Sequence, residues 1–457
     1  MQQGVKDYKR ILIVSVLCLG INSLGGFSAL PYVYFILLLG LLCYSYELFI
    51  KALIFFIICN VTGYSMQGDE DLSFFSIFNS KFLGITFFGY LNFVNIIYVF
   101  TRKDFWPLSK LIKNVIYLYI FAFLLGLLNI IQNSHVDLTE SFFINDINLF
   151  SSIISGIAAF RYFLIKYPEY KNGVVIIKFI SYCFLAKFIY TIYRIAVFSK
   201  YGYDLYTYDS IEIFYPFLFL SLLYLNKLNI LSKKFICISI VISIFPLIFF
   251  PLSTRILIVL MFFIVVLLLF FKSVYKFYFF ALVLMLIILL GGFISMDFFN
   301  LRMNKIENIS SLFFADQESL NSGSIRFHQL KAISQDFLEN PSYIIIGKGF
   351  GGFYKMPEIK SYLNEAAFNT SSLREGVYNN THIPILTFIL KFGIAGTSFF
   401  LYSIFNDKIN LTRYKIIFLF VVLLILTALF SSKAFFFFGF ISQFYFLFYF
   451  NNKSLDS

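Results

Sequence analysis

The chain has 457 residues, of which 60% are hydrophobic, 22% aromatic and only 13% charged, with a formal net charge of +12. Soluble globular domains are about 45–50% apolar and about 25% charged, so this composition excludes a water-soluble fold and predicts an all-α polytopic membrane protein. The positive charge does not indicate a nucleic-acid partner, because most lysines and arginines lie in short clusters between apolar segments, as expected at an anionic membrane face.

Apolar segments long enough to cross a bilayer as an α-helix, which takes about 20 residues, recur along the whole chain. They predict 12 to 14 transmembrane helices, because three of the fourteen segments are short. The segments are 11–25, 30–50, 52–66, 82–101, 115–131, 149–165, 177–198, 211–226, 235–252, 256–271, 277–296, 382–404, 415–431 and 434–450. The chain therefore divides into an N-terminal transmembrane bundle of about 11 helices over 1–296, a large loop over 297–381, and about three C-terminal helices over 382–457.

The distribution of positive charge predicts the side of the membrane that each connection faces. With the N-terminus inside, the inner connections hold most of the lysines and arginines. The short outer connections then hold only Lys81, Lys200, Arg255 and Lys433, beside acidic residues that include Asp69, Glu70, Asp71, Asp137, Glu140 and Asp146. This asymmetry predicts that both termini are cytoplasmic and that the 297–381 loop is extracytoplasmic.

Metal and disulfide chemistry find little support in the sequence. The five cysteines all lie inside apolar segments, and their spacing matches neither a disulfide framework nor a metal site. Asp69-Glu70-Asp71 resembles the metal-binding Asp-x-Asp of lipid-linked sugar transferases, but a solvated acidic loop is the favoured interpretation. We expect no metal and no cofactor.

The large loop has its own local structure. Five apolar residues recur at helical spacing, namely Phe327, Leu330, Ile333, Phe337 and Leu338. They predict a helix that begins near Ser324 and ends at Asn340-Pro341. A short extended piece over 343–346 and a glycine turn over 347–352 should follow. Because the other connections are short, we expect this loop and the helix that begins at His382 to carry the function.

Several cations are candidates for binding an anionic substrate. Arg255 stands at the outer mouth of a predicted span, where a guanidinium can bind lipid phosphate in bidentate fashion or anchor the helix at the interface. Arg326 lies in the first turn of the loop helix, where a cation opposes the helix dipole; this indicates an anionic partner or a loop salt bridge. Lys187, Tyr190 and Arg194 share one face of the seventh span and mark either a polar pathway or a pairing within the bundle.

His382 is the candidate general base. Asn380 or Thr381 can cap the helix that begins there, and the positive helix end favours the neutral imidazole that a base needs. A structural histidine at the membrane interface is the alternative. Gly349 and Gly351 lack the strand–helix unit of a dinucleotide fingerprint, so we interpret them as a backbone turn, which can approach a sugar or phosphate.

Four features follow one another in the C-terminal half. Ser253-Thr-Arg255 opens a span; Arg326 begins a helix that ends in Asn340-Pro341 and precedes Gly347-Lys-Gly-Phe-Gly351; Thr381-His382 precedes a span with Gly393-Ile-Ala-Gly396; and one large outer loop is surrounded by many spans. This order resembles the bacterial O-antigen polymerase and O-antigen ligase superfamily, over roughly residues 250–400. Ile383 departs from the family, which usually has Asn or another polar residue there.

The resemblance implies a GT-C-like glycosyltransferase in the bacterial cytoplasmic (inner) membrane, with the loop facing the periplasm. Its substrate would be an undecaprenyl-pyrophosphate-linked oligosaccharide. An acceptor sugar hydroxyl attacks the anomeric carbon and lipid pyrophosphate leaves. His382 would be the base or orient the hydroxyl, Arg255 and Arg326 would hold the pyrophosphate, and Arg194 is a third cation suggested by its position alone.

We therefore expect a repeat-unit polymerase for lipopolysaccharide O-antigen or capsule polysaccharide. Two alternatives stay open, an O-antigen ligase and a lipid-linked oligosaccharide flippase. The flippase hypothesis draws on Lys187 and Lys391, both deep in predicted spans. Membrane lipid is an expected partner, and a chain-length regulator protein is a further partner to consider; no nucleic acid is expected.

Overall fold

The computed structural model describes eleven stretches of the chain and a few isolated positions before residue 29. The stretches are 29–59, 63–67, 71–75, 77–78, 80–132, 136–168, 174–197, 322–356, 376–381, 384–405 and 432–450. This part is 82% helical. Three of its helices are long and apolar enough to cross a membrane, over Lys110–Ile131, Glu140–Lys166 and Ile385–Ser403. The predicted spans between 211 and 296 and the span 415–431 lie outside the described residues.

The first two helices meet at Ser45. Helix α2 covers Leu30–Tyr44 and α3 covers Tyr46–Cys59, while Ser45 between them has extended backbone angles. The predicted boundary near Lys51 was wrong. Lys51 lies inside α3 and forms an ion pair with Glu47 one turn earlier, so its charge does not end the helix.

Two hairpins shorten the neighbouring spans predicted over 52–66 and 82–101. Strand β1 (Gly63–Gln67) pairs antiparallel with β2 (Asp71–Phe75). Strand β3 (Lys81–Phe82) pairs antiparallel with β4 (Ile85–Thr86). Helix α4 therefore begins only at Phe87 and ends at Phe100. The Thr86 side chain caps it by accepting the N–H of Gly89 at 3.0 Å, which fixes this start.

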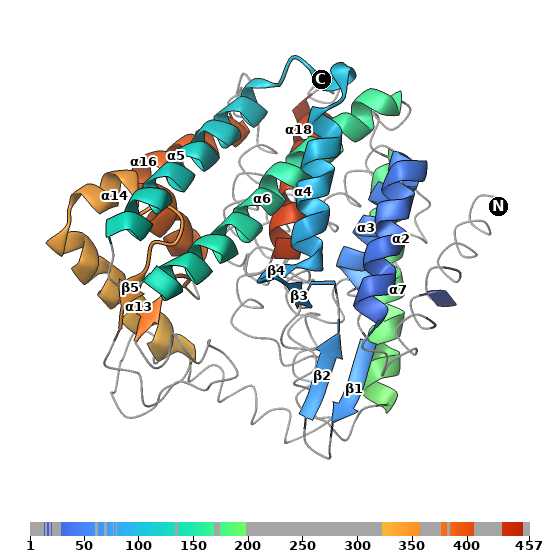
Figure 1. Cartoon of the computed structure of the whole chain (residues 1–457). Helices are drawn as coiled ribbons and strands as arrows, with labels where there is room; N and C mark the ends of the chain where they lie inside the picture. The colour runs from blue at the N-terminus through green and yellow to red at the C-terminus, as the bar shows by residue number, and fades with distance from the viewer. Residues whose placement is uncertain are drawn as a thin grey trace, which may run out of the picture.

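Helix α6 is the centre of the described part. After the short η1 (Lys103–Phe105) and α5 (Lys110–Gln132), it runs over Val136–Lys166 and crosses the middle of Figure 1. It packs against α4 and α5 and most extensively against α18, which covers Ser432–Phe450. The predicted span 149–165 was too short, because Asp146 and Asn148 in the first half of α6 have partners inside the bundle.

Small residues bring α6 and α18 into close contact. A Cβ atom added at Gly439 would lie 2.5 Å from the carbonyl oxygen of Ile153, and one added at Gly156 would lie 2.9 Å from the Phe440 nitrogen. Close approach of this kind is how membrane helices gain van der Waals contact without a hydrophobic driving force between them. Around this contact α18 buries a run of phenylalanines, Phe435–Phe438 and Phe440.

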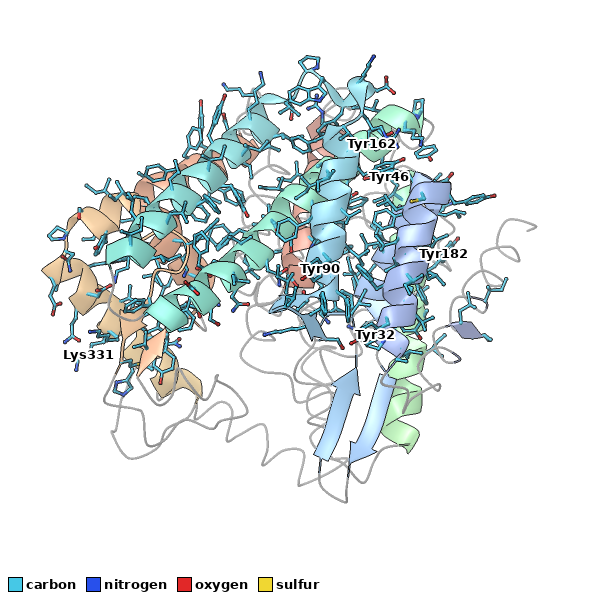
Figure 2. All side chains as sticks on the ribbon, in the orientation of Figure 1. Tyr32, Tyr46, Tyr90, Tyr162, Tyr182 and Lys331 are labelled. Carbon is cyan, nitrogen blue, oxygen red and sulfur yellow. The ribbon has the colours of Figure 1, made fainter. Side chains whose placement is uncertain are left out.

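Hydrogen bonds between buried side chains join α4 to α6. Asn92 Nδ2 donates to Ser152 Oγ at 2.9 Å, and Asn95 Nδ2 donates to Ser155 Oγ at 2.9 Å. The Tyr46 hydroxyl of α3 donates to Asn95 Oδ1 at 3.0 Å, which adds a third helix to this set. Figure 2 shows Tyr46 beside Tyr162, and their ring centroids are 4.8 Å apart.

The described part of the large loop follows the predicted order with one exception. The predicted loop helix is confirmed as α13 over Ser322–Glu339. The segment predicted to be extended is instead the short helix α14, Ser342–Ile346, because Pro341 before it has αR angles and Gly347 ends it at φ 76°. Strands β5 (Tyr354–Lys355) and β6 (Val377–Tyr378) then pair antiparallel.

Helix α16, over Pro384–Phe405, is broken at Gly393, where φ is 66°. It lies beside α5 and α14 on one side of α6, whereas α2, α3 and α7 (Val174–Val197) lie on the other (Figure 1). A large core of apolar residues extends over the helices, and a smaller one joins α13, β5, β6 and α16.

Candidate functional site

The glycine turn, residues 347–352, is built into the break of α16. At Gly393 the helix leaves αR angles, so the carbonyls of Leu390 and Lys391 lose their usual partners one turn later. The turn supplies replacements: the N–H of Lys348 donates to Leu390 O at 2.7 Å and that of Gly349 donates to Lys391 O at 3.0 Å. Loop and helix therefore complete each other's hydrogen bonding.

The same turn is locked against α5 and α6. The N–H of Phe350 donates to the carbonyl of Ala122 at 2.9 Å. The N–H of Gly351 donates to Asp146 Oδ2 at 2.7 Å. Gly349 has φ 74°, and a Cβ there would lie 2.6 Å from both Gly126 N and Leu125 Cβ, so both its backbone angles and its surroundings require glycine.

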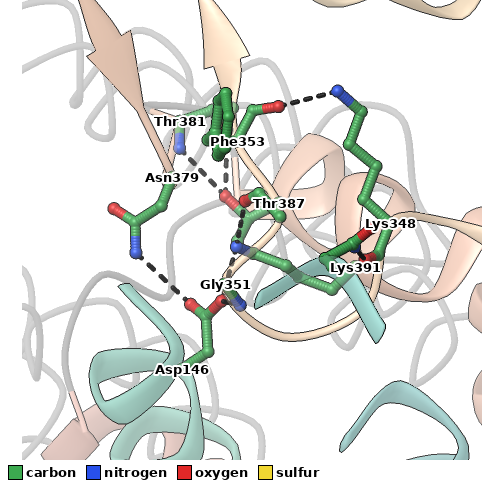
Figure 3. A network of polar contacts seen from close by, with 10 residues as sticks. Asp146, Lys348, Gly351, Phe353, Asn379, Thr381, Thr387 and Lys391 are labelled. Carbon is green, nitrogen blue, oxygen red and sulfur yellow. Dashed lines mark hydrogen bonds and ion pairs between the residues drawn. The ribbon is translucent and has the colours of Figure 1, made fainter. Parts of the chain in front are cut away.

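A buried ion pair lies at the centre of this junction (Figure 3). Lys391 Nζ is 2.5 Å from Asp146 Oδ2 and also donates to the carbonyl of Gly352 at 2.6 Å. Both side chains are 0% exposed. The Nδ2 of Asn379, in the segment that precedes α16, reaches Asp146 Oδ1 at 3.5 Å. One carboxylate therefore connects α6, α16, the glycine turn and the segment after β6.

Two further contacts fix the edges of the junction. Lys348 Nζ is 2.5 Å from Asp336 Oδ2 of α13 and donates to Phe353 O at 2.8 Å. At the start of α16, Thr387 Oγ1 accepts the N–H of Thr381 at 3.0 Å and lies 3.1 Å from its Oγ1. The segment that leads to His382 is thus held against the first turn of α16.

Strands β5 and β6 carry a pair of buried tyrosines, Tyr354 and Tyr378, whose ring centroids are 5.9 Å apart. Burial raises the pKa of Tyr354, and its neighbour Tyr378 adds to the shift. Burial also raises the pKa of Tyr378. Both phenols are therefore protonated at neutral pH, and neither is a candidate base.

The arrangement is suited to holding a loop in place. Asp146 and Lys391 are buried and fully engaged with one another and with backbone groups, so neither offers a free proton acceptor or nucleophile. Within the part of the chain that the structure describes, no group of three His, Cys, Asp or Glu residues could hold a metal ion. The junction therefore supplies no catalytic group of its own.

Of the three predicted catalytic residues, only Arg326 lies in the part of the chain that the structure describes. Arg255 and His382 lie outside it. The backbone of Arg326 lies in α13, as predicted, but its side chain is not described. Thr381 and Pro384, which flank the histidine, are both described, and Thr381 belongs to the junction.

Of the predicted substrate-binding residues, the structure brings Gly349 and Gly351 into the junction. Gly349 packs against α5 there, and the N–H of Gly351 donates to the Asp146 carboxylate. Lys187, Tyr190 and Arg194 lie on α7, which Figure 1 shows on the opposite side of α6 from α13 and α14. Lys187 is buried there, and the side chains of the other two are not described.

Sequence reasoning assigned Asp146 to an outer connection, and this was wrong. The residue lies inside α6 because its charge is satisfied by Lys391, far along the chain. A signal was present: Lys391 is a cation within an apolar span, and such a charge requires a buried partner. No periodicity in the sequence identifies which carboxylate that partner is.

No protein-family model matches the chain, and no curated protein or solved structure matches it. Function is therefore argued from the residues and their geometry.

Proposed function

We propose that this chain is a polymerase of O-antigen or capsular polysaccharide, a multi-pass glycosyltransferase with 12 to 14 transmembrane helices and a GT-C-like fold. It transfers a glycan from undecaprenyl pyrophosphate to a sugar hydroxyl of an acceptor repeat unit. The reaction takes place at the outer face of the bacterial cytoplasmic membrane, beside the 297–381 loop.

One observation carries the proposal: segments that resemble the family separately in the sequence are in contact in the fold. The Gly347–Gly351 segment donates backbone hydrogen bonds to α16 next to Gly393. The N–H of Gly351 in the turn binds Asp146, and Lys391 of α16 pairs with the same carboxylate. Asn379, in the segment before Thr381-His382, also reaches Asp146. A motif order that arose by chance would not require these three segments to share one junction.

The proposed chemistry uses one histidine and two arginines. His382 accepts the proton of the acceptor hydroxyl while its oxygen attacks the anomeric carbon, and the bond from that carbon to the pyrophosphate oxygen breaks. Arg255 and Arg326 offset the charge that develops on the departing pyrophosphate. Gly349 and Gly351 contribute through the packing of the turn, and Arg194, Lys187 and Tyr190, all on α7, are the further candidates for binding the substrate.

The flippase alternative loses one of its two supports. It drew on Lys391 as a charge available to a substrate deep in the membrane. Because this amine is paired with Asp146 and bound to the Gly352 carbonyl, it is not available to a passing substrate.

The test is the surface polysaccharide ladder of a deletion strain complemented with variants. His382→Ala, Arg255→Ala and Arg326→Ala should each leave a single lipid-bound repeat unit without longer chains, because positioned acid–base catalysis alone contributes about 10²- to 10⁴-fold. His328→Ala and Lys331→Ala, both on α13, serve as matched controls and should give normal ladders. Immunoblots of the membranes verify equal protein levels.

Normal ladders in all three catalytic variants would refute the proposed site. In the deletion strain, long chains that accumulate on the carrier without reaching their acceptor would assign the ligase activity instead. Loss of every outer-leaflet glycan, including the single unit, would assign the flippase.

A further inference from the structure

We propose that residues 342–352, comprising α14 and the glycine turn, form a re-entrant segment. The chain enters the membrane beside α16, turns among α5, α6 and α16, and leaves on the side from which it came. The outward face of α14 then contacts lipid hydrocarbon. This inference concerns the path of the chain and does not rest on glycosyl transfer.

The depth of the contacts is the first argument. The turn touches Ala122 and Gly126 of α5, Asp146 of α6, and Leu390 to Gly393 of α16. All of these residues lie inside helices that are long and apolar enough to span a membrane. At 1.5 Å per residue they stand about 8–14 Å from the nearer end of their spans, whereas the midplane of a hydrocarbon core about 30 Å thick is about 15 Å deep.

These span ends belong to one side of the membrane. A short connection joins the end of α5 to the start of α6. Helices α5 and α16 run antiparallel, since Asn114, near the start of α5, bonds to Ser403 at 2.9 Å while Ala122 and Lys391 both contact the turn. The depths measured from Ile131, Glu140 and Ile385 are therefore depths below the same face of the membrane.

The second argument is the hydrogen bonding of the segment. Non-helical backbone at membrane depth is tolerated only where its polar groups are satisfied inside the protein. Every backbone N–H from Gly347 to Gly352 donates to a protein acceptor. The Lys348 carbonyl accepts from Asn129 Nδ2, the Gly352 carbonyl accepts from Lys391, and the only charge of the segment, Lys348, is paired with Asp336.

The third argument is the surface that the segment leaves uncovered. Ile345 is 60% exposed, and Leu338 at the end of α13 is 75% exposed. Helix α14 packs on α16, whose Ile394 is 52% exposed one residue after the break. Helix α5, which packs on α16, also carries exposed apolar residues, which include Ile120, Leu124 and Leu128. Exposed apolar side chains on neighbouring membrane-spanning helices fit lipid chains as their occupant.

Single added cysteines in the full-length protein test the proposal. Ile345→Cys is the test position, Ile394→Cys the lipid control, and Lys331→Cys the water control, since Lys331 projects outward from α13 in Figure 2. Each protein is labelled with bimane and reconstituted in phosphatidylcholine vesicles; the unmodified protein corrects for its native cysteines. Iodide then reports contact with water, and doxyl-labelled acyl chains report contact with lipid.

We expect the Ile345→Cys label to be quenched by the doxyl chains to the extent seen at Ile394→Cys and to be protected from iodide. The Lys331→Cys label should show the opposite. Iodide quenching at 345 equal to that at 331 would overturn the proposal, because the segment would then be an aqueous loop. Protection from both quenchers would also overturn it, because another protein surface would then cover the face.

Discussion

At the scale of single residues, the Asp146–Lys391 pair connects the elements of the junction. Each charge is costly to bury alone, and each is compensated by the other and by backbone groups of the glycine turn. Removing one partner leaves the other charge buried without compensation. The two residues should therefore be strongly coupled energetically, even though neither touches the substrate in the proposed mechanism.

We predict that Lys391→Met lowers the free energy of unfolding by about 3–5 kcal/mol, the range for breaking a buried pair. The double variant Asp146→Asn with Lys391→Met should recover part of this loss, because an amide can still accept the Gly351 N–H without a stranded charge. Thermal unfolding of the purified proteins in detergent measures both. Losses that simply add between the two sites would contradict the coupling.

At the scale of elements, the contact between α6 and α18 fixes the centre of the bundle. Gly156 and Gly439 face the partner helix so closely that a methyl group has no room. The rings of Phe436 and Phe440 stack with centroids 6.3 Å apart, and Phe440 meets Phe160 with ring centroids 5.0 Å apart. The helices can approach because both carry glycine at their crossing.

We predict that Gly439→Ala lowers the free energy of unfolding by about 1–3 kcal/mol, as overpacking of a well-filled core does. Gly40→Ala in α2 is the matched control, since a Cβ there would meet nothing within 4 Å. The control should be neutral or slightly stabilising, because alanine favours a helix. Equal unfolding temperatures for the two variants would show that the helices separate without cost.

At the scale of the whole molecule, the fold collects positive charge at one end. The end of α4, η1, the start of α5 and the end of α6 meet there, where Arg161 donates to the carbonyl of Pro107 at 3.4 Å. This end carries Arg102, Lys103, Lys110, Lys113, Arg161 and Lys166. Figure 1 shows the β1–β2 hairpin at the opposite end.

We predict that the basic end faces the cytoplasm, since positively charged connections are retained there. A green fluorescent protein fused after Trp106 should fluoresce, and an alkaline phosphatase inserted in the β1–β2 hairpin should be active. Phosphatase activity at Trp106 with an inactive hairpin fusion would reverse the orientation, and would place the glycine turn on the cytoplasmic side.

Most of the predicted spans among the described residues are helical, and three of these helices are long and apolar enough to cross a membrane. Errors occurred where a charged residue had an ionic partner and where local backbone angles decided the structure. Lys51 did not end a helix, Asp146 did not lie in a connection, and the residues after Pro341 formed a helical turn. A hydropathy pattern treats a charged residue such as Lys51 or Asp146 as an interruption, because it registers neither a partner one turn earlier nor a partner far along the chain.

Composition and spacing were enough to predict that the chain is largely apolar, that its described part is mostly helical, that a helix precedes Asn340-Pro341, and that the glycines after it form a turn. These features depend on local backbone preference and on composition. Only the tertiary structure decided that this turn completes the broken helix α16 and that Asp146 neutralises Lys391. Those two outcomes depend on which groups far apart in the chain come within a few ångströms of one another, and local preference carries no record of that.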